Sequence, residues 1–590
     1  MDRMLFPRPA QISDLDATKH LSRELRVVLD PSVPPQGYRL VVDDNSAQLR
    51  HADAAGRTYG LQTVERLRHS DGTLPAATVE DQPVFLTRAY MLDVSRDRVP
   101  TRATLERIVG VLAECRYNQL QLYVEHTFAY RGHDEVWAGT SPLDAGDLEW
   151  LDGLCLDAGI ELVANQNCFG HLGPWLALDA YRHRAECPDG YEVAPGIRFP
   201  PAVLAPTQDN ADFVLGLVRE QSSALTSTTV NIGCDETFEL GLGVSRSLVE
   251  QHGRAEVYLA HLARMVDPLV AEGRVVQFWA DIVAHHPEHL ELLRTENVIA
   301  LVWNYDGPDA PVVDLPEIVA DILGSLQIDI NADARFSTRL EPFIGSGLTT
   351  WVAPGTSTWN SVVGRLDNAY ANLLDAAVAG HSAGAEGYLV TDWGDGGHHQ
   401  PWTVSLGPIA YGAAVAWDAS ANSDLDVIAV VDSVLLDSPG LGVGAILDRI
   451  GRVAERTGLN ARNSSPIFTA LVPSAFTLTG LGEPDPASVA EVIEILDSAT
   501  SDLAEVVPTE RFGADLIEEL AVAVALARFG AESVAISAGS SGPEVGERAD
   551  ALDQLISRYR DAWLTTARPG GLERSAAHLQ ATADGLRSGI

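Results

Sequence analysis

Short apolar runs alternate with amphipathic stretches through the middle of this 590-residue chain, from about residue 86 to 420. The runs have the length of strands, and the stretches between them, such as 102–115, 209–225 and 360–379, space their apolar residues as helices do. Eight such alternations predict an α/β fold built on a parallel (β/α)8 barrel of the TIM type. An open doubly wound sheet competes with the barrel, but no GxGxxG motif follows the first run. The predicted strands are 89–94, 119–124, 160–164, 228–234, 275–280, 298–303, 348–353 and 386–391.

The two flanks of the predicted barrel have different patterns. In residues 1–85, β-type runs at 25–29 and 38–42 are separated by prolines and a glycine, 45–51 is a further candidate strand, and 56–68 has helical spacing. This part therefore predicts a small N-terminal α+β domain. Residues 421–590 are rich in Ala, Leu, Val and Glu with helical periodicity, notably at 515–536 and 549–566, and predict a helical C-terminal domain. Within the barrel (86–420), the Pro- and Asp-rich stretch 307–335 is expected to be an insertion.

Composition narrows the classes of partner and compartment. The formal net charge of −41 disfavours binding to nucleic acid or to anionic membranes. No apolar run approaches the ~20 residues of a membrane span, and the N-terminus has no apolar core of signal-peptide length. The five cysteines form no CxxC or other tight metal spacing. We therefore expect a cytoplasmic protein without a structural zinc site.

Two adjacent carboxylates, Asp235 and Glu236, follow the apolar run 228–234. Neighbouring side chains on a strand point to opposite faces, so both acids can enter one pocket only where the strand ends. The carboxyl ends of the strands are where parallel α/β barrels place their chemistry. The structural alternative is an N-cap followed by an acidic first helical turn.

Polar and aromatic side chains gather after the other predicted strands as well. A lone Trp or His is usually structural, but the collective pattern predicts an acid-lined pocket with aromatic walls. Such pockets suit sugars, because C–H faces pack on aromatic rings and hydroxyls need acceptors. The candidate residues of this pocket are Glu125, His171, Asp235, Glu236, Trp279, Trp303, Tyr305, Trp359, Trp393 and Asp395.

A metal site is a competing interpretation of the last strand end. Asp392, Asp395, His398 and His399 include possible ligands, and Asp281 or His171 could complete a site. The chain has no HExxH motif, and no HxH follows the first strand. We therefore expect neither a catalytic metal nor a cofactor.

Four segments resemble glycoside hydrolase family 20, the β-N-acetylhexosaminidases. Residues 88–96 (RAYMLDVSR) and 118–125 (NQLQLYVE) resemble the first two barrel strands of that family, and 231–236 (NIGCDE) resembles its catalytic segment. The closing strand of one branch of the family resembles 391–398 (TDWGDGGH). Residues 25–68 also resemble the small domain that precedes the barrel there. Cys234 stands where the family usually has a second glycine.

The resemblance implies an exo-acting, retaining enzyme that removes terminal β-linked N-acetylglucosamine or N-acetylgalactosamine. The 2-acetamido oxygen of the substrate would attack the anomeric carbon, and water would open the resulting oxazolinium. Glu236 would protonate the leaving oxygen and then activate the water, which requires a raised pKa. Asp235 would stay ionised, orient the acetamido N–H and stabilise its developing charge.

Further roles follow from matched positions. The resemblance implies that Arg88 binds hydroxyls of the terminal sugar, although it starts its strand rather than ending it. His171 would support the acid, and Asp395 would bind sugar hydroxyls. The tyrosine that holds the acetamido carbonyl has no motif match, and Tyr305 is the candidate. Trp279, Trp303 and Trp393 would line the pocket.

Three alternatives remain open on the residues alone. A retaining glycosidase of another type would use Asp395 or Glu125 as nucleophile. A sugar-binding protein without activity would keep the pocket, and a metal-dependent hydrolase would need a chelatable ion. The expected partner is an oligosaccharide with a terminal N-acetylhexosamine. The C-terminal domain could either form a homodimer or cover the pocket.

Overall fold

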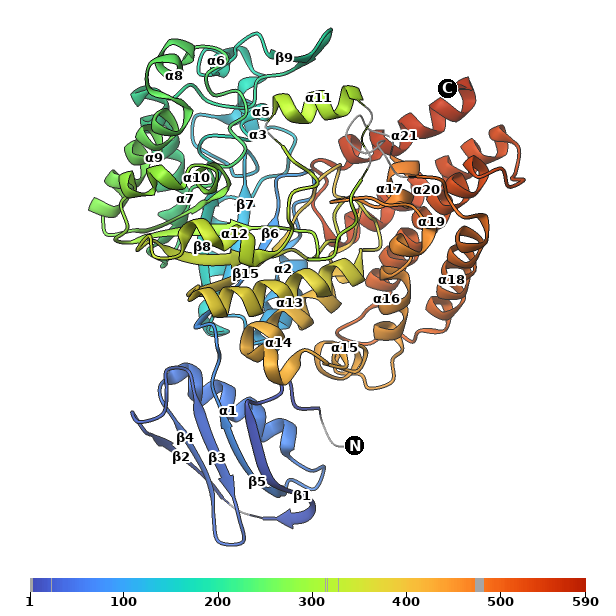
Figure 1. The fold of residues 1–590 in the computed structure, drawn as a ribbon. Coiled ribbons are helices and arrows are strands. Elements are labelled where there is room, and N and C mark those ends of the chain that lie inside the picture. The colour runs from blue at the N-terminus through green and yellow to red at the C-terminus, as the bar shows by residue number, and fades with distance from the viewer. Residues whose placement is uncertain are drawn as a thin grey trace.

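Three regions make up the molecule in a computed structural model that describes residues 4–22, 24–313, 315, 317–326, 328–472 and 482–589. A five-stranded sheet with one helix lies at one end, and the barrel and a group of C-terminal helices lie side by side above it (Figure 1). The N-terminal region contacts the end of the barrel at which the first barrel strand starts. Helix α14 (Leu406–Asn422) lies at the same contact.

The barrel has eight strands that close on themselves, and every neighbouring pair is parallel. All eight lie on the runs from which the sequence predicts them, so the predicted fold is confirmed. The β-branched run at 228–234 contributes a strand of only three residues, because the chain turns away before its acids. The strands in chain order are β6 (Thr87–Asp93), β7 (Gln119–Val124), β8 (Glu161–Gln166), β11 (Thr229–Asn231), β12 (Val275–Trp279), β13 (Val298–Trp303), β14 (Thr349–Ala353) and β15 (Gly387–Asp392).

Helices surround the barrel and bury their apolar faces on the strands. Side-chain caps start several of them: Thr101 accepts from Thr104 at α2, Asp144 and Asp147 form a capping box at α4, and Thr207 accepts from Asn210 at α7. The main helices are α2 (Arg102–Glu114), α4 (Ala145–Asp157), α7 (Gln208–Ser222), α9 (Arg254–Ala271), α13 (Leu366–Ala383) and α14.

Shorter elements decorate the carboxyl ends of the strands. The β9–β10 hairpin follows β8, and the stretch after β13 that the sequence predicts as an insertion carries α11. The β9–β10 hairpin and α11 stand above the barrel mouth, whereas α12 packs on α13 at the side of the barrel (Figure 1). The bounds of these shorter elements are α3 (Asp134–Trp137), α5 (Gly173–Leu176), α6 (Asp179–Arg182), β9 (Tyr191–Ala194), β10 (Ile197–Phe199), α8 (Arg246–His252), α10 (Asp281–Ala284), α11 (Glu317–Ser325) and α12 (Phe336–Leu340).

The N-terminal sheet is larger than the sequence analysis predicts. Three expected strands and the expected helix are present, and two further strands, β1 and β5, pair antiparallel at its other edge. β1 was missed because nearly all of its side chains are exposed, so it lacks the alternation of a half-buried strand. The sheet order is β1 (Gln11–Leu21), β5 (Leu74–Asp81), β3 (Tyr38–Val42), β4 (Ala47–His51) and β2 (Leu25–Leu29), with α1 (Ala54–Leu67) against it.

The C-terminal region is helical, as predicted, and it is anchored to the barrel by buried ion pairs. Arg98 lies 2.7 Å from Glu519, and Arg568 lies 2.7 Å from Asp147. By length and composition α19 could cross a membrane, but 61% of its most apolar window is buried inside the molecule. The helices are α15 (Val427–Val430), α16 (Val443–Gly451), α17 (Pro466–Leu471), α18 (Pro486–Glu505), α19 (Ala514–Ser537), α20 (Val545–Thr566) and α21 (Leu572–Ser588).

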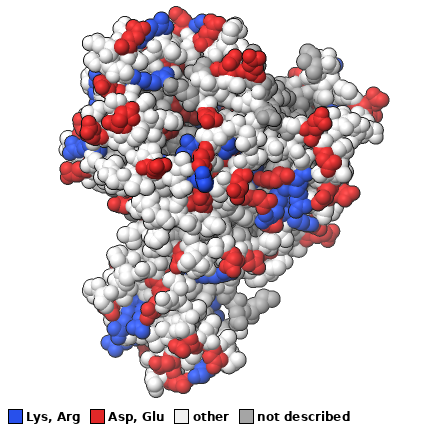
Figure 2. Space-filling view, viewed as in Figure 1, with Lys and Arg blue, Asp and Glu red and all other residues white. Residues whose placement is uncertain are grey.

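The surface reflects the acidic composition. Asp and Glu side chains are spread over all three regions on the face shown in Figure 2, with smaller groups of Lys and Arg between them. Acidic side chains prevail on this face but are spread over it and do not gather in one patch, in keeping with the net charge of −41.

Candidate active site

The backbone beyond β11 is held in an uncommon conformation. Gly233, Cys234 and Glu236 have φ values of +66°, +75° and +49°. Non-glycine residues rarely occupy this left-handed region, and such strain gathers at functional sites. Gly170 allows the close approach that the turn needs, since a Cβ there would lie 2.2 Å from the carbonyl oxygen of Asp235. The turn brings both acids to the same end of the barrel.

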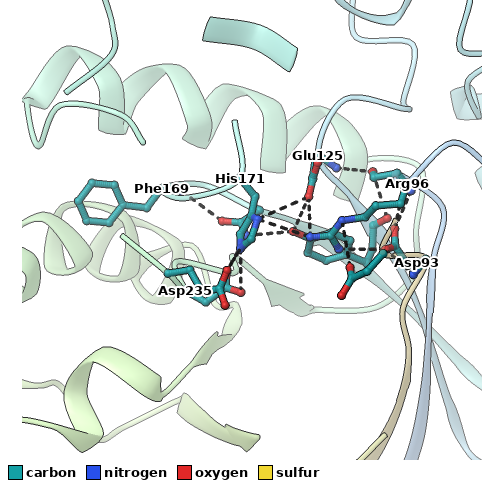
Figure 3. Close-up of polar contacts among 12 residues, drawn as sticks. Asp93, Arg96, Glu125, Phe169, His171 and Asp235 are labelled. Carbon is teal, nitrogen blue, oxygen red and sulfur yellow. Dashed lines mark hydrogen bonds and ion pairs between the residues drawn. The ribbon is translucent and has the colours of Figure 1, made fainter. Parts of the chain in front are cut away.

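His171 joins the two acids. Its Nε2 lies 3.3 Å from Oδ2 of Asp235 and 3.3 Å from Oε2 of Glu236. Figure 3 shows the ring between Asp235 on one side and Glu125 and Arg96 on the other. His171 also has a left-handed backbone, with φ of +56°. The imidazole therefore holds the pair in one place.

Different electrostatic environments shift the pKa values of Asp235 and Asp281 in opposite directions. Burial by itself raises the pKa of Asp235, but His171 and an Asn167 amide 2.7 Å away more than offset this, so its pKa lies below the usual range. Burial and the nearby Asp235 raise the pKa of Asp281 well above its usual range. Oδ2 of Asp281 accepts the backbone N–H of Glu236 at 3.1 Å. The site thus favours the charged form of Asp235 and the neutral form of Asp281.

The protonation of His171 follows from the same contacts. Burial alone lowers the pKa of His171, but the charges and hydrogen bonds of Asp235 and Glu236 raise it well above its usual range. The ring is therefore an imidazolium, and its Nε2 N–H lies 3.3 Å from an oxygen of each acid. This gives the pocket a fixed positive charge directly beside its two acids.

Arg96 organises a second group of acids at the mouth of the barrel. Its guanidinium lies 2.9 Å from Asp93, 3.2 Å from Glu125 and 3.7 Å from Asp395. It also lies over the ring of Trp393, 5.1 Å from the centroid. Burial, with Asp93 and Glu236 nearby and Arg96 opposing, raises the pKa of Asp395 to about 6. Arg96 is not among the residues predicted from the sequence, although its place just beyond β6 follows the strand-end rule that applies to the other candidates.

The predicted aromatic residues do form one group. Trp303 stacks on Tyr305 at 5.1 Å, Tyr305 meets Trp359 edge-on at 5.1 Å, and Trp279 lies 5.8 Å from Trp393. Tyr123, which was not predicted, joins this group through Trp393 at 4.8 Å. The indole N–H groups of Trp279 and Trp303 are buried, and the described residues offer them no acceptor.

Arg88 is the one predicted site residue that the structure places elsewhere. It is fully buried at the start of β6, and its guanidinium donates to Phe85 O at 2.7 Å, Tyr59 Oη at 2.9 Å and Arg116 O at 3.0 Å. Parallel strands all start at the same end of a barrel, roughly 20 Å from where they finish for a strand of this length. The prediction that Arg88 binds sugar is therefore wrong, and Arg88 joins the barrel to helix α1 of the N-terminal region.

The remaining predicted residues lie together at the carboxyl end of the barrel. Glu125 is buried, accepts from Tyr123 Oη at 3.0 Å and pairs with Arg96. Among the described residues, no group of three or more His, Cys, Asp or Glu side chains is arranged to hold a metal ion.

A cleft of about 1100 Å³ opens over this site. Arg96, Glu236 and Asp395 line it from the barrel, and side chains of α17, α20 and α21 line it from the C-terminal region. Side chains of these C-terminal helices thus line one side of the pocket, and a role in forming a homodimer stays a prediction.

Fold and site together define a (β/α)8 barrel protein with a carboxylate pair and an aromatic pocket at the carboxyl ends of its strands. Residues 10–82, which include all five strands of the N-terminal sheet, match the family model described as glycosyl hydrolase family 20, domain 2. A β-N-acetylhexosaminidase of Cellulomonas fimi is 26% identical over 304 residues, which cover 47% of this chain and 60% of that relative. A β-hexosaminidase of Akkermansia muciniphila is 27% identical over 135 residues, 22% of this chain and 26% of the relative.

Solved structures share the fold over most of the chain. A chitobiase of Flavobacterium johnsoniae has a TM-score of 0.54 at 14% identity, with 93% of this chain and 95% of that chain covered. A β-N-acetylhexosaminidase of Bacteroides fragilis has a TM-score of 0.52 at 15% identity, with 70% and 90% covered. The curated relatives match over only a quarter to three fifths of their own length. The chain thus matches one domain model of glycoside hydrolase family 20 over residues 10–82, and it shares its fold with the solved structures.

Proposed function

We propose that this protein is an exo-acting β-N-acetylhexosaminidase that hydrolyses terminal β-linked N-acetylhexosamines with the help of the substrate's own acetamido group. The observation that carries the proposal is the pair Asp235 and Glu236, held side by side by one histidine. The names of the curated relatives support the same activity.

The geometry suits an acetamido nucleophile. Asp235 is anionic and accepts from Asn167, which leaves the carboxylate fixed beside the pocket. A fixed anion can accept the acetamido N–H and stabilise the positive charge that develops as the carbonyl oxygen attacks the anomeric carbon. The C–O bond to the leaving group breaks, the oxazolinium carries the charge, and water then reopens it with net retention.

Glu236 is placed to move the proton in both steps. It lines the cleft, so its carboxyl reaches the side on which a leaving group must depart. As the acid it gives its proton to the leaving oxygen, and as the base it takes one from water. The imidazolium of His171 donates to one of its oxygens and so orients the other.

The aromatic group would form the pocket for the terminal sugar. Burial raises the pKa of Tyr305 far above its usual range, so its hydroxyl stays a donor, and we propose that it holds the acetamido carbonyl. The unpartnered N–H groups of Trp279 and Trp303 need acceptors, which sugar oxygens supply. Arg96, rather than Arg88, would bind the hydroxyls at the mouth together with Asp395.

A chromogenic assay tests the proposal directly. The p-nitrophenyl glycosides of N-acetylglucosamine and N-acetylgalactosamine should both be compared, and at least one should be hydrolysed with retention of configuration. A stable analogue of the cyclised intermediate should inhibit far more tightly than the free sugar. Absence of turnover on both glycosides would contradict the proposal.

One other function has support from the geometry. Asp395 lines the same cleft as Glu236, which keeps a retaining glycosidase with a carboxylate nucleophile as the second candidate. That enzyme would be trapped covalently by a 2-fluoro sugar, whereas the acetamido mechanism would not. Glu125 is less suited to this role, because its Oε1 already accepts from Tyr123 Oη and pairs with Arg96.

Compartment and assembly are also proposals. We place the protein in the cytoplasm, and the five cysteines, all buried and free of disulfides, support a reducing compartment. A homodimer stays a prediction that light scattering on the purified protein would test.

A further inference from the structure

The cleft over Glu236 is far larger than one terminal sugar needs. Its volume of about 1100 Å³ exceeds the range for pockets that enclose drug-sized ligands, roughly 300–1,000 Å³. Polar groups stand at its floor, where Arg96, Glu236 and Asp395 meet the barrel. Its walls are apolar over most of their extent and come from separate parts of the chain: Tyr191, Phe199, Phe238, Ile328, Phe468 and Leu586.

The roof of this cleft is fixed to the barrel. Helix α21 contributes Ala577, Ala581 and Gly585, whose small side chains leave an open wall. A ring nitrogen of His578 on the same helix lies 3.0 Å from the carbonyl oxygen of Gly396, next to Asp395. His399 donates to the carbonyl of Ser575 at 3.2 Å. The apolar walls therefore form a preformed binding surface beside the acids.

Arg548 on α20 is an unusual member of this cleft. Its exposed fraction is only 7%, and its Nε is buried without an acceptor among the described residues. One terminal nitrogen donates to Ser533 at 2.5 Å, and the guanidinium lies over Phe529. The carboxylate whose charge favours the charged form of Arg548 is Glu532, and Glu532 is itself paired with Arg528 at 2.7 Å. A guanidinium that is taken out of water without a carboxylate is costly, so an anion is the missing partner.

We propose that this cleft binds the leaving group of the substrate, and that this group has an apolar body ending in an acidic group that pairs with Arg548. The inference rests on the proposed function, because it takes Glu236 as the proton donor to the leaving oxygen. The donor stands on the leaving-group side of the bond, so the space that continues from Glu236 is where that group lies. Apolar walls bind an aromatic or alkyl body, and Arg548 selects the charge at its end.

Matched aryl N-acetylglucosaminides test this inference. Each carries a phenol with an alkyl chain at the para position, and the chain ends in either a methyl or a carboxylate, over a series of lengths. The phenol has the same leaving ability in each pair, so differences in kcat/KM report binding of the chain. For the best length we expect the kcat/KM of the carboxylate compound to exceed that of the methyl compound about tenfold, through a lower KM, which corresponds to about 1.4 kcal/mol.

Variants on α20 identify the residue responsible. In Arg548→Met the ratio of the two kcat/KM values should fall to about one, and Arg548→Lys should recover part of it. Arg558→Met is the matched control, because Arg558 lies on the same helix but is exposed and paired with Glu518, so the ratio should stay at its wild-type value. Should Arg548→Met fail to fold, Arg548→Gln replaces it.

The outcomes separate the two claims. Hydrolysis of the short phenyl glycoside without any preference for the carboxylate chain at any length would overturn the inference and leave the proposed function standing. No hydrolysis of any glycoside would overturn the proposed function. In that case calorimetry measures how the free phenols with a carboxylate-ended chain bind to wild type and to Arg548→Met. The comparison still decides whether the cleft binds an apolar anion.

Discussion

The two ends of the barrel use arginine in opposite ways. Arg88 starts β6, is fully buried and donates only to backbone carbonyls and neutral side chains. Arg96 comes just after the same strand and contacts Asp93, Glu125 and Asp395 at the mouth of a cleft. Eight residues apart in sequence, one joins two parts of the fold and the other arranges titratable groups around open space.

The difference teaches that burial alone does not identify a functional charge. Both guanidiniums are largely removed from water, and both contact aromatic rings. What distinguishes Arg96 is the company of acids with shifted pKa values and of residues with strained backbones, such as His171 and Glu236. Such groupings are typical of sites that bind or react.

The largest effect is expected at the carboxyl end, from Glu236→Gln. Loss of the proton donor should lower kcat/KM by about 10³–10⁴ for leaving groups that need protonation, and by much less for activated phenols. Thermal unfolding should change little, because Glu236 is partly exposed in the cleft. Kinetics on a series of aryl glycosides of rising phenol pKa measures this, and wild-type rates in the variant would remove Glu236 from the mechanism.

Asp235→Asn should follow closely. The amide keeps the shape but cannot stabilise a positive acetamido group, so we expect kcat to fall by about 10²–10³. KM should change much less than kcat, since the lost interaction strengthens only as charge develops. A rise in KM of the same size, with kcat unchanged, would show that Asp235 only binds substrate.

Exchange of the two arginines for methionine tests the comparison itself. Arg96→Met should lower kcat/KM by about 10²-fold, through loss of a charge-assisted site for the sugar, while the fold persists. Arg88→Met should leave several buried carbonyls without donors and lower the free energy of unfolding by about 3 kcal/mol. Urea unfolding and kinetics on both proteins decide; the reverse pattern would contradict our assignment of the two ends.

A smaller effect concerns pH. Because the pKa of Asp395 is raised to about 6, its carboxylate is lost as pH falls through that value, and kcat/KM should decline there. Asp395→Asn should lack this limb of the profile. The sign for folding is opposite: ionising a group whose folded pKa exceeds 3.8 costs stability as pH rises from about 4 to 6. The variant should therefore gain stability over wild type above pH 6 and not below pH 4.

The smallest effect is expected at Cys234→Gly. Glycine relieves a left-handed backbone that costs about 1–3 kcal/mol, and it loses the burial of one thiol, worth about 1 kcal/mol. The two changes largely offset each other, so the free energy of unfolding in urea should rise by no more than about 2 kcal/mol with activity retained. A loss of several kcal/mol would mean that the thiol itself supports the turn.

The sequence was sufficient for the barrel but not for everything around it. The eight barrel strands are apolar runs with buried side chains, so local pattern and fold agree. β1 carries no such pattern, and only its pairing with β5 reveals it. The wall of the cleft depends on α20 and α21, more than 300 residues from Glu236, whose arrangement no local pattern encodes.

The candidate site shows the same division. Strand ends predicted the acids and the aromatic group, because position in a parallel barrel fixes which end a residue occupies. The role of Arg88 rests on matched position alone, against that rule, and Arg96 is the arginine that lies beside Asp395 at the carboxyl end. Arg548 was not predictable, since nothing in its local sequence shows that it lacks an acid.

Comparison of p-nitrophenyl β-N-acetylglucosaminide with p-nitrophenyl β-glucoside tests the central claim most directly. The two differ only in the group at carbon 2, and we propose that the acetamido group at that position is the nucleophile. We predict turnover of the acetamido glycoside and a kcat/KM at least about 10³-fold lower for the 2-hydroxyl compound, in keeping with the loss of an intramolecular nucleophile. Equal hydrolysis of both would contradict the claim.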